Sequence, residues 1–141
     1  MDVDLIRSMW AERPDYRVDL LARRNRVTVR SDTDVIAETL RPLLVDEQDH
    51  GLVLYIPRED VYMHHLDPSD TVTHCPFKGA ASHWRLFGSD GPDVAWSYED
   101  PFPEVARIAG YVAFYQDRVH VELGQAPPTS LARGARRESR P

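Results

Sequence analysis

Cysteine and lysine are the two residue types that this chain of 141 residues almost lacks. A single cysteine, Cys75, excludes an intrachain disulfide and any zinc site built from Cys-x-x-Cys pairs. Sixteen of the 17 basic residues are arginine, a bias typical of GC-rich coding, and the one lysine is Lys78. The only lysine therefore lies three residues from the only cysteine, so the two rarest side chains fall in one short segment.

Long hydrophobic runs are also absent. No apolar segment approaches the ~20 residues that a membrane-spanning helix needs. The first residues, Met1-Asp2-Val3-Asp4, carry acid where a secretory signal carries base, and no apolar stretch follows them. We therefore expect a soluble protein of a reducing compartment, located in the cytoplasm and without a membrane partner.

Basic charge is scarce relative to acidic charge. The 17 Arg and Lys face 23 Asp and Glu, which gives a net charge of −6. Because nucleic-acid affinity comes largely from basic groups on phosphates, this balance argues against nucleic acid as a partner. Residues 125–141 are the exception, with four Arg and one Glu, and they leave −9 for residues 1–124. We predict that this basic tail is disordered.

Hydrophobic periodicity predicts a mainly β protein. Alternation of apolar and polar residues over 26–30 and a second run over 35–40 indicate a hairpin. The unbroken apolar run at 52–56 is typical of a strand covered on both faces. Polar and glycine-rich segments at 88–92 and 116–118 are expected to be hairpin loops. The remaining strands are predicted over residues 61–66, 71–75, 80–87, 93–98, 111–115 and 119–123.

Helix is expected at two places only. Residues 1–10 place apolar side chains near one face of a short helix, and one helical turn is expected near residues 103–108. We predict a single compact antiparallel β domain of about eight short strands over residues 26–124. Residues 1–25 form the N-terminal helix and a lead-in, and the basic tail follows the domain. A chain of this length has room for one hydrophobic core.

Chemistry-bearing side chains are densest in the run Thr73-His74-Cys75-Pro76-Phe77-Lys78-Gly79. Cationic neighbours can activate a thiol, and a lysine in a partly apolar pocket can attack a carbonyl or hold an anion. We predict Cys75 and Lys78 as candidate catalytic residues and His74 as a candidate substrate-binding residue. The alternative is a small buried cysteine beside a solvated loop lysine.

Aromatic residues are predicted to wall a pocket near this run. Trp84 and Trp96 lie on strands that should pair, and Trp96 and Tyr98 are two residues apart and so share a face. Rings of this kind with one or two polar groups suit a planar or cationic small ligand, although they can equally fill a core. We predict Trp84, Trp96, Tyr98 and Tyr111 as candidate substrate-binding residues.

A charged triplet, Arg58-Glu59-Asp60, lies between the apolar run at 52–56 and the next predicted strand. Asp60 could pair with Lys78 or with an arginine, or transfer a proton, which makes it the third candidate catalytic residue. Arg58 is a candidate substrate-binding residue. The alternative is a solvated turn.

Histidines are the only further side chains that suggest a metal. His64, His65, His74 and His83 can be considered with Cys75 as zinc ligands. Adjacent residues of a strand point to opposite faces, so at most one of His64 and His65 enters a given site. The chain has no known ligand spacing, and we predict neither a metal nor a cofactor.

Several separated segments form an ordered pattern. They are residues 73–79, Ala95-Trp96-Ser97-Tyr98, Ile108-Ala109-Gly110-Tyr111-Val112-Ala113-Phe114 and, upstream, Ile56-Pro57-Arg58-Glu59-Asp60-Val61. Together they resemble the domain of unknown function 427 family, over about residues 26–123. The resemblance implies a β-tent fold, like Mss4-type zinc modules, methionine sulfoxide reductase B and the ligand-binding domain of cereblon. Those proteins often carry two Cys-x-x-Cys pairs, a pattern from which this chain departs.

The resemblance implies a domain rather than a reaction. The family carries a nucleotidyltransferase-like label, but we find no Gly-Ser followed by paired Asp to hold two metals, so this is the weaker alternative. We predict a small-molecule-binding β domain that acts on an anionic or carbonyl-containing metabolite through residues 74–79, without a metal. A non-catalytic ligand-binding or protein-interaction module is the alternative. An exposed edge strand could also pair two chains as a homodimer.

Overall fold

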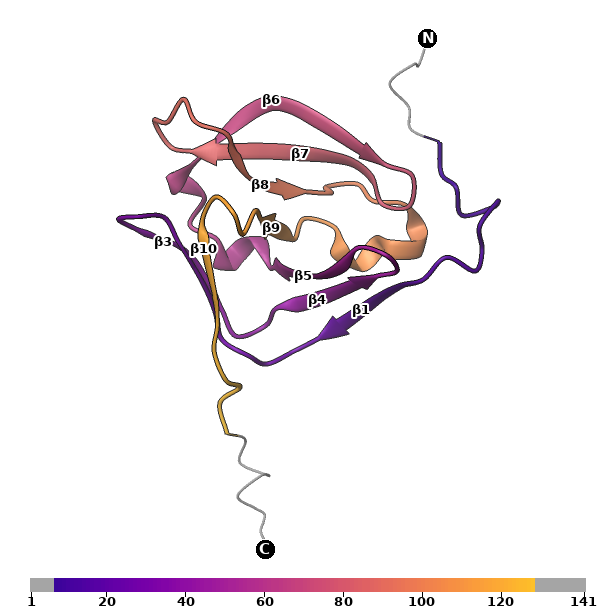
Figure 1. Ribbon diagram of the computed structural model, residues 1–141, viewed down its shortest axis with the longest axis horizontal. Helices are drawn as coiled ribbons and strands as arrows, with labels where there is room; N and C mark the ends of the chain where they lie inside the picture. The colour runs from indigo at the N-terminus through magenta and orange to yellow at the C-terminus, as the bar shows by residue number, and fades with distance from the viewer. Residues whose placement is uncertain (1–6, 129–141) are drawn as a thin grey trace, which may run out of the picture.

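The computed structural model describes residues 7–128. These residues form ten antiparallel strands and three short 3-10 helices, and the strands make two sheets arranged as an open sandwich (Figure 1). The prediction of a mainly β, antiparallel fold is confirmed. None of the helices within this range is long and apolar enough to cross a membrane.

The larger sheet contains seven strands in the order β1-β4-β5-β9-β8-β7-β6. These are β1 (Val18–Ala22), β4 (Leu43–Glu47), β5 (Gly51–Ile56), β6 (Leu66–Cys75), β7 (Gly79–Leu86), β8 (Asp93–Ser97) and β9 (Val112–Phe114). The smaller sheet has the order β10-β2-β3. Its strands are β2 (Val27–Arg30), β3 (Val35–Thr39) and β10 (His120–Leu123), and the helices are η1 (Arg58–Asp60), η2 (Met63–His65) and η3 (Pro103–Ile108).

Two buried clusters stabilise this arrangement. One lies between the sheets and includes Val27 and Ile36 of the smaller sheet and Ile56 of the larger one. The other lies on the opposite face of the larger sheet, where η3 contributes Ile108 and β5 contributes Tyr55. Because side chains alternate along a strand, neighbouring residues of β5 belong to different clusters. The larger sheet is thus covered on both faces over its centre.

Several local predictions are confirmed. β2 and β3 form the expected hairpin, and β7 pairs with β8 across the loop at residues 88–92. The helical turn predicted near residues 103–108 is η3. The sequence patterns missed β1 and β4, which pair with each other. β1 is an edge strand of mixed exposure. The β4 sequence Leu-Leu-Val-Asp-Glu does not alternate between apolar and polar residues, although its side chains alternate between buried and half-buried in the structure.

Two predicted elements are wrong. Residues 61–66 are not a strand, because Val61 makes only an isolated bridge to Ala37 and the 3-10 helix η2 follows. Residues 111–115 and 119–123 do not form a hairpin. β9 pairs with β5 and β8, whereas β10 pairs with β2 in the other sheet. The intervening residues carry the chain from one sheet to the other.

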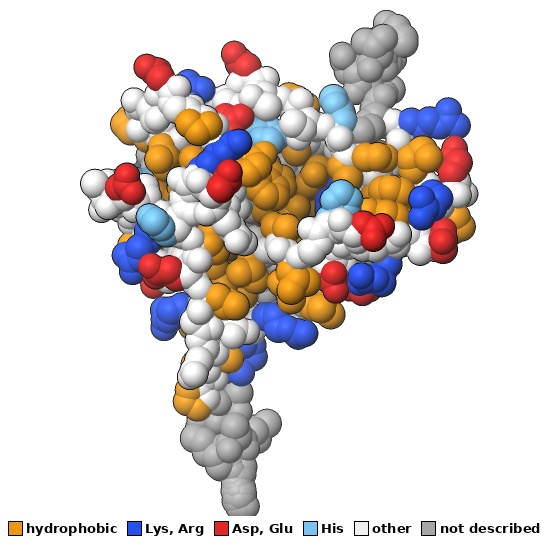
Figure 2. Space-filling view, viewed as in Figure 1, with side chains coloured by type: hydrophobic (Ala, Val, Ile, Leu, Met, Phe, Trp, Pro, Cys, Tyr) orange, Lys and Arg blue, Asp and Glu red, His pale blue; other side chains and the backbone are white. Residues whose placement is uncertain are grey.

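The run at residues 52–56 is a strand, but it is not covered on both faces along its whole length. Leu52 is 59% exposed, whereas Ile56 at the other end is buried. Figure 2 shows hydrophobic side chains at the surface over β4 and β5, beside β10. One end of this part of the sheet therefore extends beyond the smaller sheet.

The N-terminal helix predicted over residues 1–10 lies mostly outside the described residues, as does most of the basic tail at 125–141. Residues 7–10 are not helical. They lead instead to the turn between β6 and β7, where the Met9 amide donates to the Pro76 carbonyl at 3.0 Å. The Trp10 indole donates to the Phe77 carbonyl at 2.8 Å. In Figure 1 this segment runs along the end of the larger sheet.

Candidate functional site

The only lysine of the chain is buried. Lys78 lies in the turn between β6 and β7 and is 5% exposed. Its amide donates to the Cys75 carbonyl at 3.3 Å, and its carbonyl accepts a hydrogen bond from the Phe102 amide at 3.0 Å. Gly79 follows with φ of +114°, which residues with a side chain rarely adopt. Hydrogen bonds therefore fix both the amide and the carbonyl group of Lys78.

A carboxylate from a distant strand pairs with this lysine. Glu47, the last residue of β4, is 8% exposed and forms a buried ion pair with Lys78. Tyr16 Oη donates to its other carboxylate oxygen at 2.5 Å, and His50 Nε2 lies 3.8 Å from that oxygen. Burial raises the pKa of Glu47, but hydrogen bonds from Lys78 and Tyr16 outweigh this effect and hold the pKa below its usual value. Glu47 is therefore ionised.

Two phenols complete this polar group. Burial, followed by the hydrogen bond to Glu47, raises the pKa of Tyr16, and burial raises the pKa of Tyr98. Both hydroxyls therefore remain protonated at neutral pH. Lys78 Nζ lies 5.9 Å from the centre of the Tyr98 ring, within the range of a cation–π contact.

The thiol lies beside the ammonium group. Cys75, the last residue of β6, is half-buried, and its Sγ is 4.0 Å from Lys78 Nζ. A positive charge at this distance can stabilise negative charge that develops on the sulfur or on a group bonded to it.

These side chains line one pocket of about 480 Å³. The Tyr16 ring stacks on the Phe77 ring with centroids 3.7 Å apart, and Trp10 packs edge-on against Phe77. The N-terminal segment thus forms one wall of the pocket, and β4 and the β6–β7 turn form the others. The lining residues are Tyr16, Glu47, His50, His74, Cys75, Pro76, Phe77, Lys78 and Tyr98.

Four of the residues predicted from the sequence lie together in this pocket: His74, Cys75, Lys78 and Tyr98. The prediction missed Glu47, although its signal was present in Leu43-Leu44-Val45-Asp46-Glu47. If this run is a strand, Glu47 shares a face with Leu43 and Val45, and an acid on an apolar face needs a partner. Tyr16 carried no comparable signal, because it lies in an irregular segment.

The charged triplet lies elsewhere. Asp60 does not line the pocket but accepts hydrogen bonds from Thr39 Oγ1 at 2.7 Å and from Arg41 at 3.4 Å. The carboxylate partner of Lys78 is thus Glu47 and not Asp60. Arg58 pairs with Glu99 at 2.6 Å, and its guanidinium lies 5.2 Å from the Trp84 ring centre.

The predicted aromatic wall is not formed. Trp84 pairs with Ala95, one residue out of step with Trp96, so the two indoles point to opposite faces of the sheet. Trp84 is buried between the sheets, whereas Trp96 donates to Tyr55 Oη at 3.2 Å on the other face. Tyr111 lines a different pocket. Of the four predicted aromatic residues, only Tyr98 lines the pocket that contains Cys75 and Lys78.

The histidines are dispersed. His64 and His65 lie in η2, and His83 is buried with Nε2 2.9 Å from Thr73 Oγ1. Burial lowers the pKa of His83, although the charge of Asp93 opposes this effect. Within residues 7–128, no three His, Cys, Asp or Glu side chains are grouped as a metal site requires.

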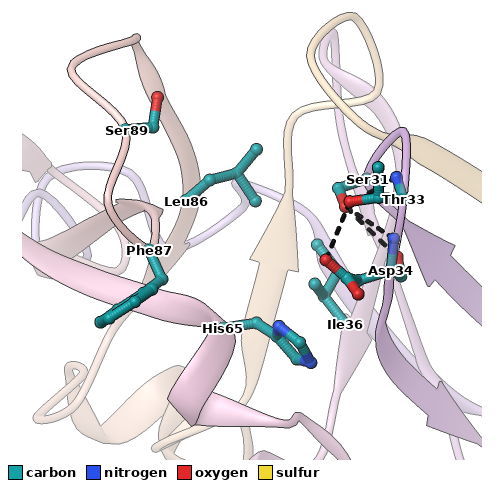
Figure 3. Close-up of a pocket in the computed structure, with 8 residues that line it drawn as sticks. All are labelled: Ser31, Thr33, Asp34, Ile36, His65, Leu86, Phe87 and Ser89. Atoms are coloured by element: carbon teal, nitrogen blue, oxygen red, sulfur yellow. Dashed lines mark hydrogen bonds between the residues drawn. The ribbon is translucent and has the colours of Figure 1, made fainter.

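A smaller pocket of about 230 Å³ lies between the β2–β3 turn and the β7–β8 loop (Figure 3). Ser31 Oγ accepts a hydrogen bond from the Asp34 amide at 3.1 Å on one side, and His65 and Phe87 lie on the other. Neither Asp34 nor His65 is buried. Since this pocket contains no buried charge and no predicted site residue, the pocket at Lys78 is the stronger candidate.

The fold and the site together define an antiparallel β sandwich with a buried Lys–Glu pair in a pocket. A family model described as a domain of unknown function (DUF427) matches residues 19–125. The match covers more than half of the chain, which therefore belongs to this family. A comparison with curated proteins found no match. Glu47, Cys75, Lys78 and Tyr98 lie inside the matched segment, whereas Tyr16 precedes it.

Proposed function

We propose that the pocket at Lys78 binds a small molecule that carries both an anionic group and a carbonyl group. One observation carries the proposal: a buried ion pair and the only thiol of the chain meet in a pocket of about 480 Å³. Removing two charges from water costs several kcal/mol per ion, so apolar packing would be the cheaper way to stabilise this turn. Ligand pockets, in contrast, usually contain a few convergent polar groups.

Lys78 has an electrostatic role in this proposal. Ionised Glu47 contacts its Nζ, so Lys78 serves as the cationic partner of a carboxylate. Lys78 therefore binds the anionic group of the ligand or stabilises negative charge on a carbonyl oxygen. Schiff-base formation, which needs the free amine, is not favoured by this geometry.

Cys75 is the proposed nucleophile. Addition of its thiol to a carbonyl forms a bond between Sγ and carbon and moves the π electron pair onto oxygen. That oxygen then takes up the proton lost by the thiol, so a hemithioacetal or hemithioketal forms without any further reactant. Lys78, 4.0 Å from Sγ, lies where it can stabilise the oxygen before it is protonated.

Non-catalytic binding is the second candidate, and one contact favours it. Glu47 already neutralises Lys78, which leaves little net charge to promote a reaction. In this case hydrogen bonds from Lys78 and its neighbours hold the ligand, and no bond forms to Cys75.

The single cysteine allows a simple test. Iodoacetamide alkylation followed by intact-mass spectrometry reports on Cys75 alone, and glyoxylate serves as the smallest probe with an aldehyde and a carboxylate. We expect glyoxylate to slow alkylation in a saturable way. Lys78→Met should abolish the protection, whereas Arg85→Gln, a change on β7 outside the pocket, should leave it intact.

The outcomes separate the candidates. Protection together with a glyoxylate adduct at Cys75 supports the nucleophile, and protection without an adduct supports binding alone. An alkylation rate that glyoxylate leaves unchanged overturns the proposal. Urea-unfolded protein is the control. If glyoxylate slows its alkylation as well, glyoxylate reacts directly with iodoacetamide or with an exposed thiol and does not act through the pocket. Lys78→Arg, which keeps the charge, tests the site if Lys78→Met does not fold.

We also propose a cytoplasmic location and no nucleic-acid partner. The lone cysteine and the net charge of −6 support both. Cell fractionation of the expressed chain and a filter-binding assay with DNA and RNA test them.

A further inference from the structure

The face of β1, β4 and β5 opposite the pocket carries a row of leucines. Leu21 pairs across to Leu44, and Leu44 pairs across to Leu54, so the three side chains share one face of neighbouring strands. Leu52, two residues before Leu54, is 59% exposed. A sheet face that meets solvent normally carries polar side chains at such positions.

A groove of about 230 Å³ follows this row. Leu123 of β10, which is 62% exposed, closes its other side. We call it the leucine groove, and it is lined by Arg23, Asn25, Leu44, Leu52, Leu54 and Leu123.

A positively charged pocket of about 330 Å³ opens around the end of β1, toward the other face of the sheet, where Leu43 and Tyr111 lie. It meets the leucine groove at Arg23, the one residue that lines both. Its lining contains four arginines and no carboxylate. Arg23 and Arg24 donate to the backbone carbonyls of Ala22 and Pro127. Arg41 is neutralised by Glu59 at 3.3 Å and Asp60 at 3.4 Å, so the positive charge comes from the other three arginines. We call it the arginine pocket, and it is lined by Ala22, Arg23, Arg24, Leu40, Arg41, Pro42, Leu43, Arg107 and Tyr111.

We propose that the arginine pocket and the leucine groove together bind a single-chain alkyl carboxylate. Guanidinium groups pair with carboxylates through two parallel hydrogen bonds, which places the head group in the arginine pocket. The alkyl chain then lies along the leucine groove, where its methylenes are removed from water. Since net charge is −6, this local excess of arginine is the feature that attracts an anion here rather than elsewhere.

Other occupants fit the charge less well. Residues 129–141 carry four Arg and one Glu, the same sign of charge as the arginine pocket. A second copy of the chain, bound through this same face, would bring one arginine pocket toward another. An anionic amphiphile instead complements both halves of the site.

Chemical shifts of the uniformly 15N-labelled chain test the proposal. Octanoate should shift the amides of β4 and β5 and those near Arg23 in a saturable way. Butyrate should bind more weakly, by up to about fourfold for each methylene that the groove covers. The neutral analogue 1-octanol should bind about tenfold more weakly than octanoate, because it lacks the charged head group.

Matched variants locate the two halves of the site. Leu52→Gln should weaken octanoate binding severalfold, whereas Val72→Gln, at a residue 58% exposed on β6, should not. Arg23→Gln should weaken binding about tenfold, and Arg85→Gln should have no effect.

Three results would overturn the proposal. They are equal affinity for octanoate and 1-octanol, shifts that do not map to the groove, and equal effects of the Leu52 and Val72 changes. Concentration-dependent broadening of the same amides, which octanoate does not reverse, would assign the face to a second copy instead. Cys75→Ser, which changes the pocket at Lys78 but keeps the buried ion pair, should leave octanoate binding intact, so this proposal and the proposed function fail separately.

Discussion

At the scale of single residues, Lys78 and Glu47 depend on each other. Each is largely removed from water, and each meets the other's charge. A buried pair of this kind contributes little net stability, but the loss of one partner leaves the other charge uncompensated. The Tyr16 hydroxyl adds a second hydrogen bond to Glu47 and so ties the N-terminal segment to the same charge.

Lys78→Met should therefore destabilise the protein by about 3–5 kcal/mol, the cost of breaking a buried pair. The double variant Lys78→Met/Glu47→Gln should recover much of this loss, because no ionised group then remains buried. Urea unfolding followed by tryptophan fluorescence measures both. Equal stability of the single and double variants would contradict the account of the pair.

Glu47 also predicts how stability changes with pH. Its pKa is below the usual value in the folded protein, so the unfolded chain binds more protons in the acidic range. The stability that Glu47 contributes is complete above about pH 5 and is lost as the pH falls through its folded pKa. Unfolding free energies measured between pH 6 and pH 3 should fall less steeply for Glu47→Gln than for the natural protein. Parallel curves would contradict this.

Single residues were predictable where scarcity or periodicity marked them. Lys78 stood out as the only lysine, and Cys75 as the only cysteine. The prediction that Asp60 lies beside Lys78 was wrong. The position of a carboxylate next to an apolar run does not show which distant side chains it contacts. The contact between Glu47 of β4 and Lys78 of the β6–β7 turn joins residues that are 31 positions apart in the sequence. A local sequence pattern contains no information about such a contact.

At the scale of elements, the β6–β7 turn positions the site. Cys75 pairs with Gly79 at the end of the two strands, and the three residues between them form the turn. The positive φ of Gly79 sets the direction in which β7 leaves that turn.

Gly79→Ala should cost about 1–2 kcal/mol, because the substitution forces a side chain into a backbone conformation that it rarely adopts. The new Cβ itself would be 3.6 Å from the Asp100 carbonyl, an ordinary contact, so the strain comes from the backbone. Thermal unfolding measures the cost. Gly124→Ala, at a glycine without positive φ where the new Cβ would lie 3.5 Å from the Arg26 carbonyl, is the comparison and should cost less.

Elements were predictable where pairing is local. The β2–β3 and β7–β8 hairpins followed from their own sequences, since each joins neighbouring runs through a short polar loop. β9 and β10 show the opposite case: both are strands as predicted, yet each pairs with distant strands in a different sheet. Their local pattern is the same whether the chain turns back or crosses between sheets.

At the scale of the whole molecule, the N-terminal segment and the matched family domain form one site. The family match begins at residue 19, whereas Trp10 and Tyr16 lie before it and cover the Phe77 side of the pocket. Strand pairing in the larger sheet begins at Val18, after both residues, whereas Tyr16 lines the pocket itself.

A chain that starts at Arg17 should therefore keep its β-sheet circular dichroism spectrum while its Cys75 reacts faster with iodoacetamide. Loss of Tyr16 removes one hydrogen bond to Glu47, and loss of Trp10 uncovers Phe77. The double variant Trp10→Ala/Tyr16→Phe in the full chain checks that the effect comes from these side chains. An unchanged alkylation rate in both proteins would show that the segment does not wall the pocket.

The most direct measurement of the central claim uses the scarcity of lysine. Protein labelled with 15N-lysine contains one labelled residue, so its side-chain ammonium signal reports on Lys78 alone. Because Lys78 is buried against Glu47 in the pocket, we expect glyoxylate to shift this signal in a saturable way and at the concentrations that protect Cys75. A signal that stays unchanged through the full titration would contradict the assignment of this pocket as the ligand site.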